Sequence, residues 1–253
     1  MKNHSLTLVA VLLFCCSACS TAKRAKADID FALQDLQVLA ARISSMDPFT
    51  HDYEEIDSLE WKLFMGIASI LQNPFFPEEK LDDIPLSQVK SYDSRIRVFN
   101  QFINTGGSWQ EYRTLFFIDR GKKAAEVFAH LPFASGAIEN MYLLPGSDKS
   151  LYLGLSGTQT CMTCYSGSAF LVDLSADSVQ MKPILEIECR WPDLDFFRYD
   201  PSRRTLEYQY SLMPDDLYDL PEPYDAVNAE GFPVYSDTLR WEMGEFRAMN
   251  PTN

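Results

Sequence analysis

Three cysteines in the second half of the chain come closest to a chemical motif. Cys161 and Cys164 form a C-x-x-C pair, and Cys189 follows them. A thiol-redox site places its first cysteine at a helix N-terminus, where the thiol pKa is lowered, whereas the residues after Cys164 predict a strand. A zinc site takes about four ligands, and no histidine lies close to these cysteines in the sequence. A structural disulfide is therefore expected, with thiol-redox chemistry at Cys161 and Cys164 as an alternative function.

The hairpin predicted after Cys164 suggests which cysteines pair. If its turn is centred on residues 176–177, Cys164 lies opposite Cys189, and Phe170 lies opposite Pro183. Directly opposed residues have Cβ atoms about 4.5–5.5 Å apart, which a small closure converts to disulfide distance. The predicted disulfide is therefore Cys164–Cys189, and the pairing within the C-x-x-C motif, Cys161–Cys164, is the alternative.

An acidic stretch near the C-terminus is the candidate binding loop. Between Thr205 and Leu239 there is no Lys or Arg, and aromatic residues are interleaved with carboxylates. Oxygen ligands suit calcium, while aromatic rings with carboxylates suit a carbohydrate, although the spacing does not match an EF-hand. The alternative is a solvated loop whose aromatic residues cover a sheet edge. The candidate residues are Asp215, Asp216, Tyr218, Asp219, Glu222, Tyr224 and Asp225.

No catalytic constellation emerges from the remaining residues. The chain beyond residue 18 has two histidines, His51 and His130, and no H-E-x-x-H motif. Residues 154–158 (GLSGT) lack the second glycine of a nucleophile elbow. A glycosidase needs two carboxylates at a fixed separation, and 36 acidic residues do not show which two would face each other. We therefore expect no catalytic residue, metal ligand or cofactor, and favour a protein that is not an enzyme.

The N-terminus predicts an export signal and a lipid anchor. Residues 6–16 are apolar, shorter than the ~20 residues that span a bilayer but typical of a signal peptide. Small residues precede Cys19, as in the lipobox of bacterial lipoproteins, although Cys16 stands where that motif prefers an aliphatic residue. Residues 1–18 are the predicted signal peptide, Cys19 the lipidated residue and residues 19–26 a tether. Cleavage after Ala22, giving a soluble periplasmic or secreted protein, is the alternative.

By resemblance, the serine after Cys19 suggests sorting to the outer membrane, so the membrane is an expected partner through the lipid. The formal charge of −14 argues against nucleic acid. A glycan or a protein is the expected soluble partner.

Hydrophobic periodicity changes once along the chain. Residues 27–45 and 53–72 predict two helices, because apolar residues recur at steps of three and four. Asp52 and Glu55 have the spacing of a capping box, with Asp in place of Ser or Thr. From about residue 84 the period becomes two, which predicts short antiparallel strands.

The clearest strand is predicted over residues 204–212, after a turn at residues 200–203 (DPSR). Another is predicted over 239–248, and the prolines between them predict a long loop at 213–235. The expected fold is α+β: a helical hairpin over residues 27–75, then an antiparallel all-β meander domain over 84–250, arranged as a sandwich, a barrel or a propeller-like sheet.

Three short segments resemble a group of secreted proteins of Gram-negative anaerobes. Residues 91–99 (SYDSRIRVF) and 105–108 (TGGS) are similar to a strand opening and a following Gly-Gly in that group, and residues 241–246 (WEMGEF) look like its closing hairpin. The group has no assigned activity. The resemblance implies export and a β-rich lipoprotein domain, and it supplies no site residues.

Together these patterns predict an exported cell-envelope lipoprotein with a non-enzymatic ligand- or partner-binding module. An envelope glycan hydrolase with a carboxylate pair is the first alternative, and a thiol-redox protein using Cys161 and Cys164 is the second.

Overall fold

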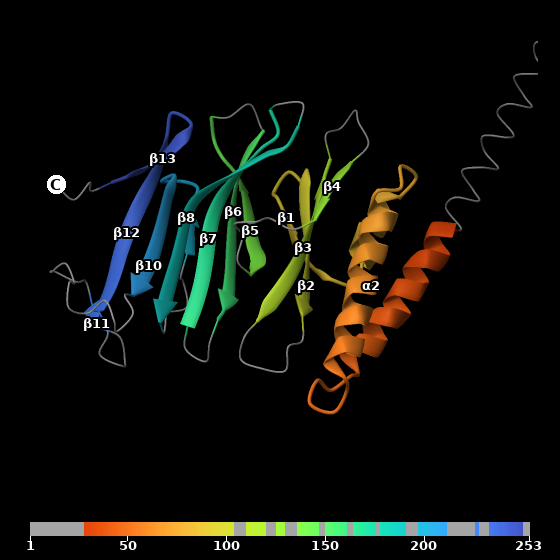
Figure 1. Ribbon diagram of the computed structural model, residues 1–253. Coiled ribbons are helices and arrows are strands. Elements are labelled where there is room, and N and C mark those ends of the chain that lie inside the picture. Colours follow the sequence, from red (N-terminus) through yellow and green to blue (C-terminus); the bar gives the residue numbers. More distant parts are fainter. Residues whose placement is uncertain are drawn as a thin grey trace, which may run out of the picture. The chain divides into compact units, whose positions relative to one another are not determined.

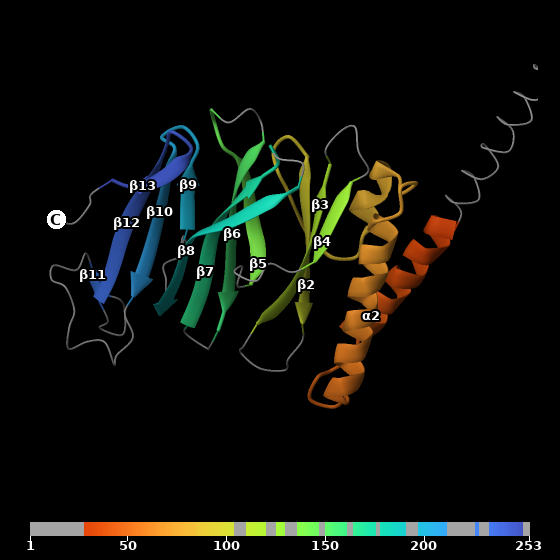
Figure 2. The same ribbon diagram turned by 45° about the horizontal axis from the view of Figure 1, so that its top comes forward.

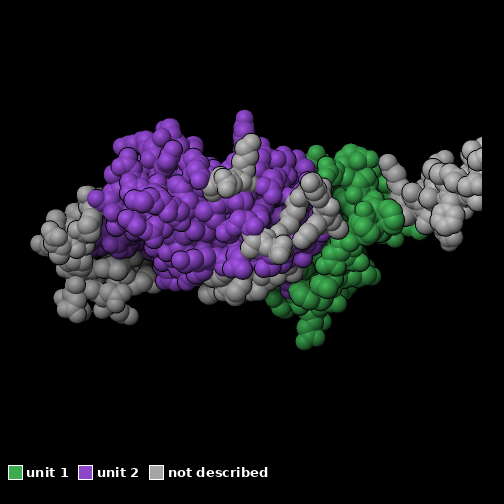
Figure 3. Space-filling view, turned by 90° about the horizontal axis from the view of Figure 1, so that it is seen from above, with its two compact units in different colours: residues 1–85 green, residues 86–253 purple. Residues whose placement is uncertain are grey.

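The structure is a computed structural model of the chain. It divides into two compact units, residues 1–85 and residues 86–253 (green and purple in Figure 3). The described residues are 28–103, 110–119, 125–129, 136–146, 150–160, 164–175, 178–190, 197–211, 226–227 and 233–249. No helix in these ranges is both long and apolar enough to cross a membrane.

The described part of the first unit contains two α-helices, as predicted. The first helix covers residues 28–44, α2 spans Tyr53–Leu71, and a 3-10 helix, η1, spans Glu78–Asp83. Asp52 caps α2 by accepting a hydrogen bond from the backbone N–H of Glu54 at 3.0 Å, which satisfies one free donor at the helix start. Glu55 forms an ion pair with Arg42 at 2.9 Å.

The described residues of the second unit form three antiparallel sheets that follow one another along the chain (Figure 1). Sheet A has the order β1-β2-β3-β4, and sheet B has the order β5-β6-β7-β8. Sheet C has the order β11-β12-β10-β9, and β13 also pairs with β12. The strands are β1 (Ser87–Lys90), β2 (Ile96–Ile103), β3 (Glu111–Ile118), β4 (Glu126–Ala129), β5 (Ala137–Leu143), β6 (Leu151–Gln159), β7 (Cys164–Asp173), β8 (Gln180–Arg190), β9 (Phe197–Asp200), β10 (Thr205–Ser211), β11 (Ala226–Val227), β12 (Pro233–Glu242) and β13 (Glu245–Ala248).

Sheet B is the middle layer of this unit, with sheets A and C on its two faces (Figures 1 and 2). Because neighbouring residues of a strand point to opposite faces, a strand buried on both sides needs apolar residues at successive positions. In β6, Tyr152 packs in the core shared with sheet A and Leu153 in the core shared with sheet C. In β7, Phe170 packs in the core shared with sheet A and Ala169 in the core shared with sheet C.

Two polar side chains tie the sheets together. The Asn100 side chain donates from Nδ2 to the Ile138 carbonyl at 2.8 Å and accepts from the Ile138 N–H at 3.0 Å, which joins β2 to β5. Trp241 Nε1 donates to the carbonyl of Pro145 at 3.2 Å, which joins sheet C to the end of β5. The α+β class with an antiparallel meander is therefore confirmed, and of the three predicted arrangements the face-to-face packing of successive meanders is closest to the propeller-like one.

Sheet C has one apolar and one polar face, as the alternation in β10 predicts. Leu206 and Tyr208 lie in or near the core shared with sheet B, while Thr205, Glu207 and Gln209 alternate with them. The boundary of the last strands differs from the prediction. β12 begins at Pro233, inside the predicted loop, and residues 239–248 form a hairpin of β12 and β13 rather than one strand. Proline is compatible with the first residue of a strand, where no ladder bond is lost.

Candidate functional site

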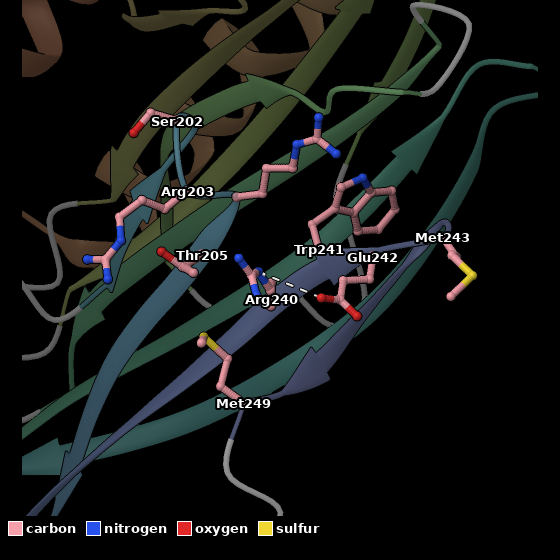
Figure 4. A pocket seen from close by; sticks show the side chains of 9 residues that line it. Ser202, Arg203, Thr205, Arg240, Trp241, Glu242, Met243 and Met249 are labelled. Atoms are coloured by element: carbon pink, nitrogen blue, oxygen red, sulfur yellow. Dashed lines mark ion pairs between the residues drawn. The ribbon is translucent and has the colours of Figure 1, made fainter.

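A pocket of about 750 Å³ opens on sheet C and is the candidate functional site. Figure 4 shows side chains from the β9–β10 turn, β12 and the β12–β13 turn gathered around it. Its lining residues are Ser202, Arg203, Arg204, Thr205, Arg240, Trp241, Glu242, Met243 and Met249.

The β9–β10 turn is held by Asp200. Its carboxylate accepts hydrogen bonds from the Ser202 N–H at 2.8 Å, the Ser202 hydroxyl at 2.6 Å and the Arg203 N–H at 3.2 Å. The Ser202 hydroxyl, followed by the backbone N–H of Arg203, lowers the pKa of Asp200 below its ordinary value. Arg204 has a φ of 59°, which closes the turn in the left-handed region. The predicted turn is therefore present, and it fixes two adjacent arginines at the rim of the pocket.

The β12–β13 turn forms the other rim. Met243 and Gly244 have φ values of 49° and 91°, and two successive positive φ values are the requirement of a type I′ hairpin turn. The Met243 side chain is 90% exposed at this tip. Trp241 and Phe246 pair across the hairpin with ring centroids 5.1 Å apart, which anchors its apolar side.

The pairing of β10 with β12 brings the arginines together. The stretch from Thr205 to Leu239 holds no Lys or Arg, and arginines lie at both of its ends. Antiparallel pairing sets Thr205 directly opposite Arg240. The two ends of the acidic stretch therefore meet, and the pocket carries three arginines and one carboxylate in a chain whose formal charge is −14.

The arginines are only loosely paired with carboxylates. Arg240 lies 3.7 Å from Glu242, and Arg203 lies 3.9 Å from Glu207. The Arg240 and Arg203 side chains are 50% and 69% exposed, so each pair is worth at most about 1 kcal/mol. A ligand can therefore replace these contacts at little cost.

Thr205 is the buried polar residue of the pocket. It is 3% exposed, and its hydroxyl has no hydrogen-bond partner among the described residues. In Figure 4 its side chain lies between those of Arg203 and Arg240. A buried hydroxyl without a partner destabilises a fold by about 1–3 kcal/mol.

The pocket offers hydrogen-bond donors rather than a catalytic pair. Its lining contains no histidine or cysteine. The Ser202 hydroxyl donates to the Asp200 carboxylate at 2.6 Å, as part of the bonds that hold the β9–β10 turn. Glu242 is the single carboxylate. Three guanidinium groups and a hydroxyl can bind an acceptor-rich group.

A second polar cluster, at the β1–β2 turn, has a structural role. Asp93 accepts hydrogen bonds from the hydroxyls of Ser91 and Tyr152, both at 2.7 Å. Burial alone would raise the pKa of Asp93, but the bonds from Tyr152 and Ser91 outweigh it and hold that pKa below its ordinary value. Because Tyr152 belongs to β6, the cluster links sheets A and B.

Stacked tyrosines line the other end of sheet C. Tyr210 stacks on Tyr235 with centroids 5.2 Å apart and on Tyr208 with centroids 6.1 Å apart. Burial, together with the Asp237 carboxylate that accepts its hydroxyl at 3.2 Å, raises the pKa of Tyr208 to about 12. Tyr208 and Tyr235 are 8% and 7% exposed, so these rings are part of the packing.

The predicted disulfide register is correct in one half of the hairpin and wrong in the other. Phe170 lies opposite Pro183, as expected. A bulge between Ala169 and Phe170 then shifts the pairing by one residue, so that Cys164 lies opposite Arg190 and not opposite Cys189. A shift by one residue moves a side chain to the other face of a sheet. The geometry on which the Cys164–Cys189 prediction was based is therefore absent.

Cys164 itself is disulfide-bonded. It is the first residue of β7, not the first residue of a helix, which is where a redox-active C-x-x-C lowers its thiol pKa. Cys161 and the side chain of Cys189 lie outside the described part of the chain. Whether Cys164 is bonded to Cys189 or to Cys161 therefore stays a prediction.

The other predicted site residues lie outside the described ranges. They are Cys19, His130 and the candidate loop residues Asp215, Asp216, Tyr218, Asp219, Glu222, Tyr224 and Asp225. His51 is described: its Nδ1 lies 3.0 Å from the Asp47 carbonyl oxygen at the exposed link between the helices. Within the described ranges no group of three or more His, Cys, Asp or Glu residues is placed to hold a metal ion.

Sequence reasoning missed the arginine pocket. The sequence predicts a turn at residues 200–203 and a hairpin at residues 241–246, and both are present. What was missing is the register that sets Thr205 opposite Arg240. The absence of basic residues between the two arginine-bearing ends is the signal that could have found the pocket. No protein-family model and no curated protein matches the chain.

Proposed function

We propose that the chain is an exported cell-envelope lipoprotein, anchored at the outer membrane through Cys19, whose β unit is a non-enzymatic binding module. The observation that carries the proposal is the pocket on sheet C, lined by three arginines and a buried, unpartnered Thr205 hydroxyl. Guanidinium groups around a buried hydroxyl suit the binding of an acceptor-rich ligand. The apolar run before Cys19 supports export and lipidation.

The two enzymatic alternatives gain no support from the described residues. The strand position of Cys164 does not favour a thiol-redox protein. A glycan hydrolase would need a second carboxylate facing Glu242 across the pocket, and the lining holds none. The binding module is therefore the function that the geometry supports best.

Replacing Cys19 is expected to release the protein from the membrane. A Cys19→Ala variant lacks the thiol that receives the lipid, so it should lose labelling by radioactive palmitate and move from the membrane fraction to the soluble envelope fraction. Ala22→Leu is the matched control, because it blocks the alternative cleavage and should leave the protein labelled and membrane-bound. A wild-type chain that takes up no label would contradict the lipoprotein proposal.

Thermal melting of residues 20–253 tests the binding proposal. The probes are glycan oligomers, peptidoglycan fragments, phosphate esters, and calcium against a chelator. A ligand at 100 times its Kd adds about 2.7 kcal/mol to the stability of the folded state. We expect one probe class to raise Tm for the wild type but not for an Arg203→Gln, Arg240→Gln double variant. Since both side chains are exposed, the free energy of unfolding of the variant should lie within about 0.5 kcal/mol of that of the wild type. A shift that persists in the double variant would place the site elsewhere.

A further inference from the structure

We infer that the pocket on sheet C binds a phosphate group, with Thr205, Arg203 and Arg240 as the residues that contact it. The inference rests on the proposed function, because it names the ligand class of the same pocket. It is carried by three observations: a local excess of positive charge in an acidic chain, a vacant donor beneath it, and guanidinium groups on both sides of that donor.

The charge of the pocket is opposite to that of the chain. Three arginines and one glutamate line it, whereas the whole chain carries −14. Like charges that face each other in a sheet repel and destabilise it. Arg240 also has Arg247 directly opposite in β13. Glu245 holds Arg247 through an ion pair, which leaves the Arg240 guanidinium for the pocket.

The unpartnered hydroxyl of Thr205 lies among these arginine side chains. The Thr205 hydroxyl is buried and unpartnered, and Figure 4 shows it with Arg203 on one side and Arg240 on the other. Strand β10 holds Thr205, the Asp200-anchored turn holds Arg203, and β12 holds Arg240. The donors therefore come from three separate backbone positions around one pocket.

The number of donor sources favours phosphate over carboxylate. A carboxylate has two oxygens, and one bidentate guanidinium satisfies them. A phosphate monoester presents three strongly accepting oxygens in a tetrahedral arrangement. Two guanidinium groups and one hydroxyl match that arrangement, with one donor source for each oxygen.

Two carboxylates compete with the ligand for the arginines. Glu242 lies 3.7 Å from Arg240, and Glu207 lies 3.9 Å from Arg203. These contacts are long and exposed, so a doubly charged phosphate displaces them. Removing Glu242 should therefore strengthen binding, which is a change in the opposite direction from that of the arginine variants.

Isothermal titration of residues 20–253 with glycerol 3-phosphate tests the inference at low salt, where screening is weak. Thr205→Val and Arg240→Gln should each weaken binding about tenfold or more, the value of one hydrogen bond to a charged group. Glu242→Gln should tighten it by up to about fivefold. Arg42→Gln makes the same charge change in the first unit, where Arg42 pairs with Glu55, and should leave binding unchanged.

The thermal stability of the Thr205→Val variant provides an independent test of whether the hydroxyl is unpartnered. Valine has the shape of threonine and suits a strand, and it removes a buried hydroxyl without a partner. The Tm should therefore stay constant or rise by about 2–4 °C. Thr158→Val is the control, because the Thr158 hydroxyl donates to the Gln110 carbonyl at 2.7 Å and its loss should lower Tm. A Thr205→Val variant that melts lower, or that binds like the wild type, would overturn the assignment.

Two further probes are needed. One tells a lipid headgroup from a free phosphate ester, and the other tells a failure of the phosphate assignment from a failure of the binding-module proposal. Vesicles of phosphatidic acid in phosphatidylcholine present the phosphate monoester on a lipid. If the wild type binds these vesicles but not glycerol 3-phosphate, and Thr205→Val weakens the vesicle binding, the pocket is assigned to a lipid headgroup. Galacturonate presents a carboxylate on a sugar. If it binds through Arg240 as tightly as the phosphate ester does, the phosphate assignment is overturned and the binding module stands. If no probe binds in a way that depends on Arg240 or Thr205, both the phosphate assignment and the binding-module proposal fail.

Discussion

Replacing Asn100 with aspartate is expected to destabilise the second unit by about 3 kcal/mol or more at neutral pH. The Asn100 side chain is 4% exposed and makes both hydrogen bonds to the backbone of Ile138. A carboxylate cannot donate to the Ile138 carbonyl, so two acceptors would face each other in the interior and a charge would be buried without a cation. Urea denaturation monitored by tryptophan fluorescence measures the loss.

The pH dependence of this variant tests the cause. Burial raises the folded-state pKa of the new carboxyl group above its unfolded value. Stability is therefore highest below the unfolded pKa, where the protonated group can again donate, and is lost as pH rises through the folded pKa. Asn140→Asp, at an exposed position of β5, is the matched control and should change stability by no more than about 0.5 kcal/mol. Equal losses in the two variants would show that Asn100 does not join the sheets.

Truncating Phe170 to alanine is expected to cost about 3–5 kcal/mol. The ring is fully buried in β7 and meets Phe116 of sheet A edge-on with centroids 6.3 Å apart. It also lies directly over Gly154, where any side chain would overlap it. The variant would leave a cavity between two sheets whose backbones cannot close it.

The control for this cavity is Phe102→Ala in β2. The Phe102 ring is 47% exposed and contacts Tyr112 at a centroid distance of 5.5 Å, so its removal should cost about 1 kcal/mol. Denaturant midpoints of the two variants, compared at equal slope, give the difference. A Phe170→Ala variant as stable as Phe102→Ala would contradict the stacked arrangement of sheets A and B.

The fold was predictable from the sequence where periodicity is strong. The two helices follow apolar steps of three and four, and β10 follows alternation of Leu206 and Tyr208 with Thr205 and Glu207. The arrangement of the sheets was harder to predict. The three meanders differ in strand length and in turns, so they leave no fixed period in the sequence. The central sheet can be identified only by noticing that β6 and β7 are apolar on both faces.

The candidate site was less predictable, because register decides it. One extra residue, Ile184 of β8 opposite the Ala169–Phe170 step, moved Cys164 from Cys189 to Arg190. Pro183 beside it is typical of bulges and edge strands, but a proline does not fix where the register shifts. Strand register also determines the arginine pocket, because the pairing of β10 with β12 sets Thr205 opposite Arg240. Local patterns predicted both turns around it, but a pocket between distant segments depends on which residues the strands set opposite each other.

The most direct test of the central claim is an NMR titration of the arginine Nε–Hε resonances in residues 20–253 with glycerol 3-phosphate. If the pocket on sheet C is the ligand site, the Arg203 and Arg240 resonances should shift together along one saturable curve. Those of Arg42 in the first unit and Arg113 in sheet A should not move. Saturable shifts at other arginines, with Arg203 and Arg240 unchanged, would contradict the assignment of the pocket and the binding function that we base on it.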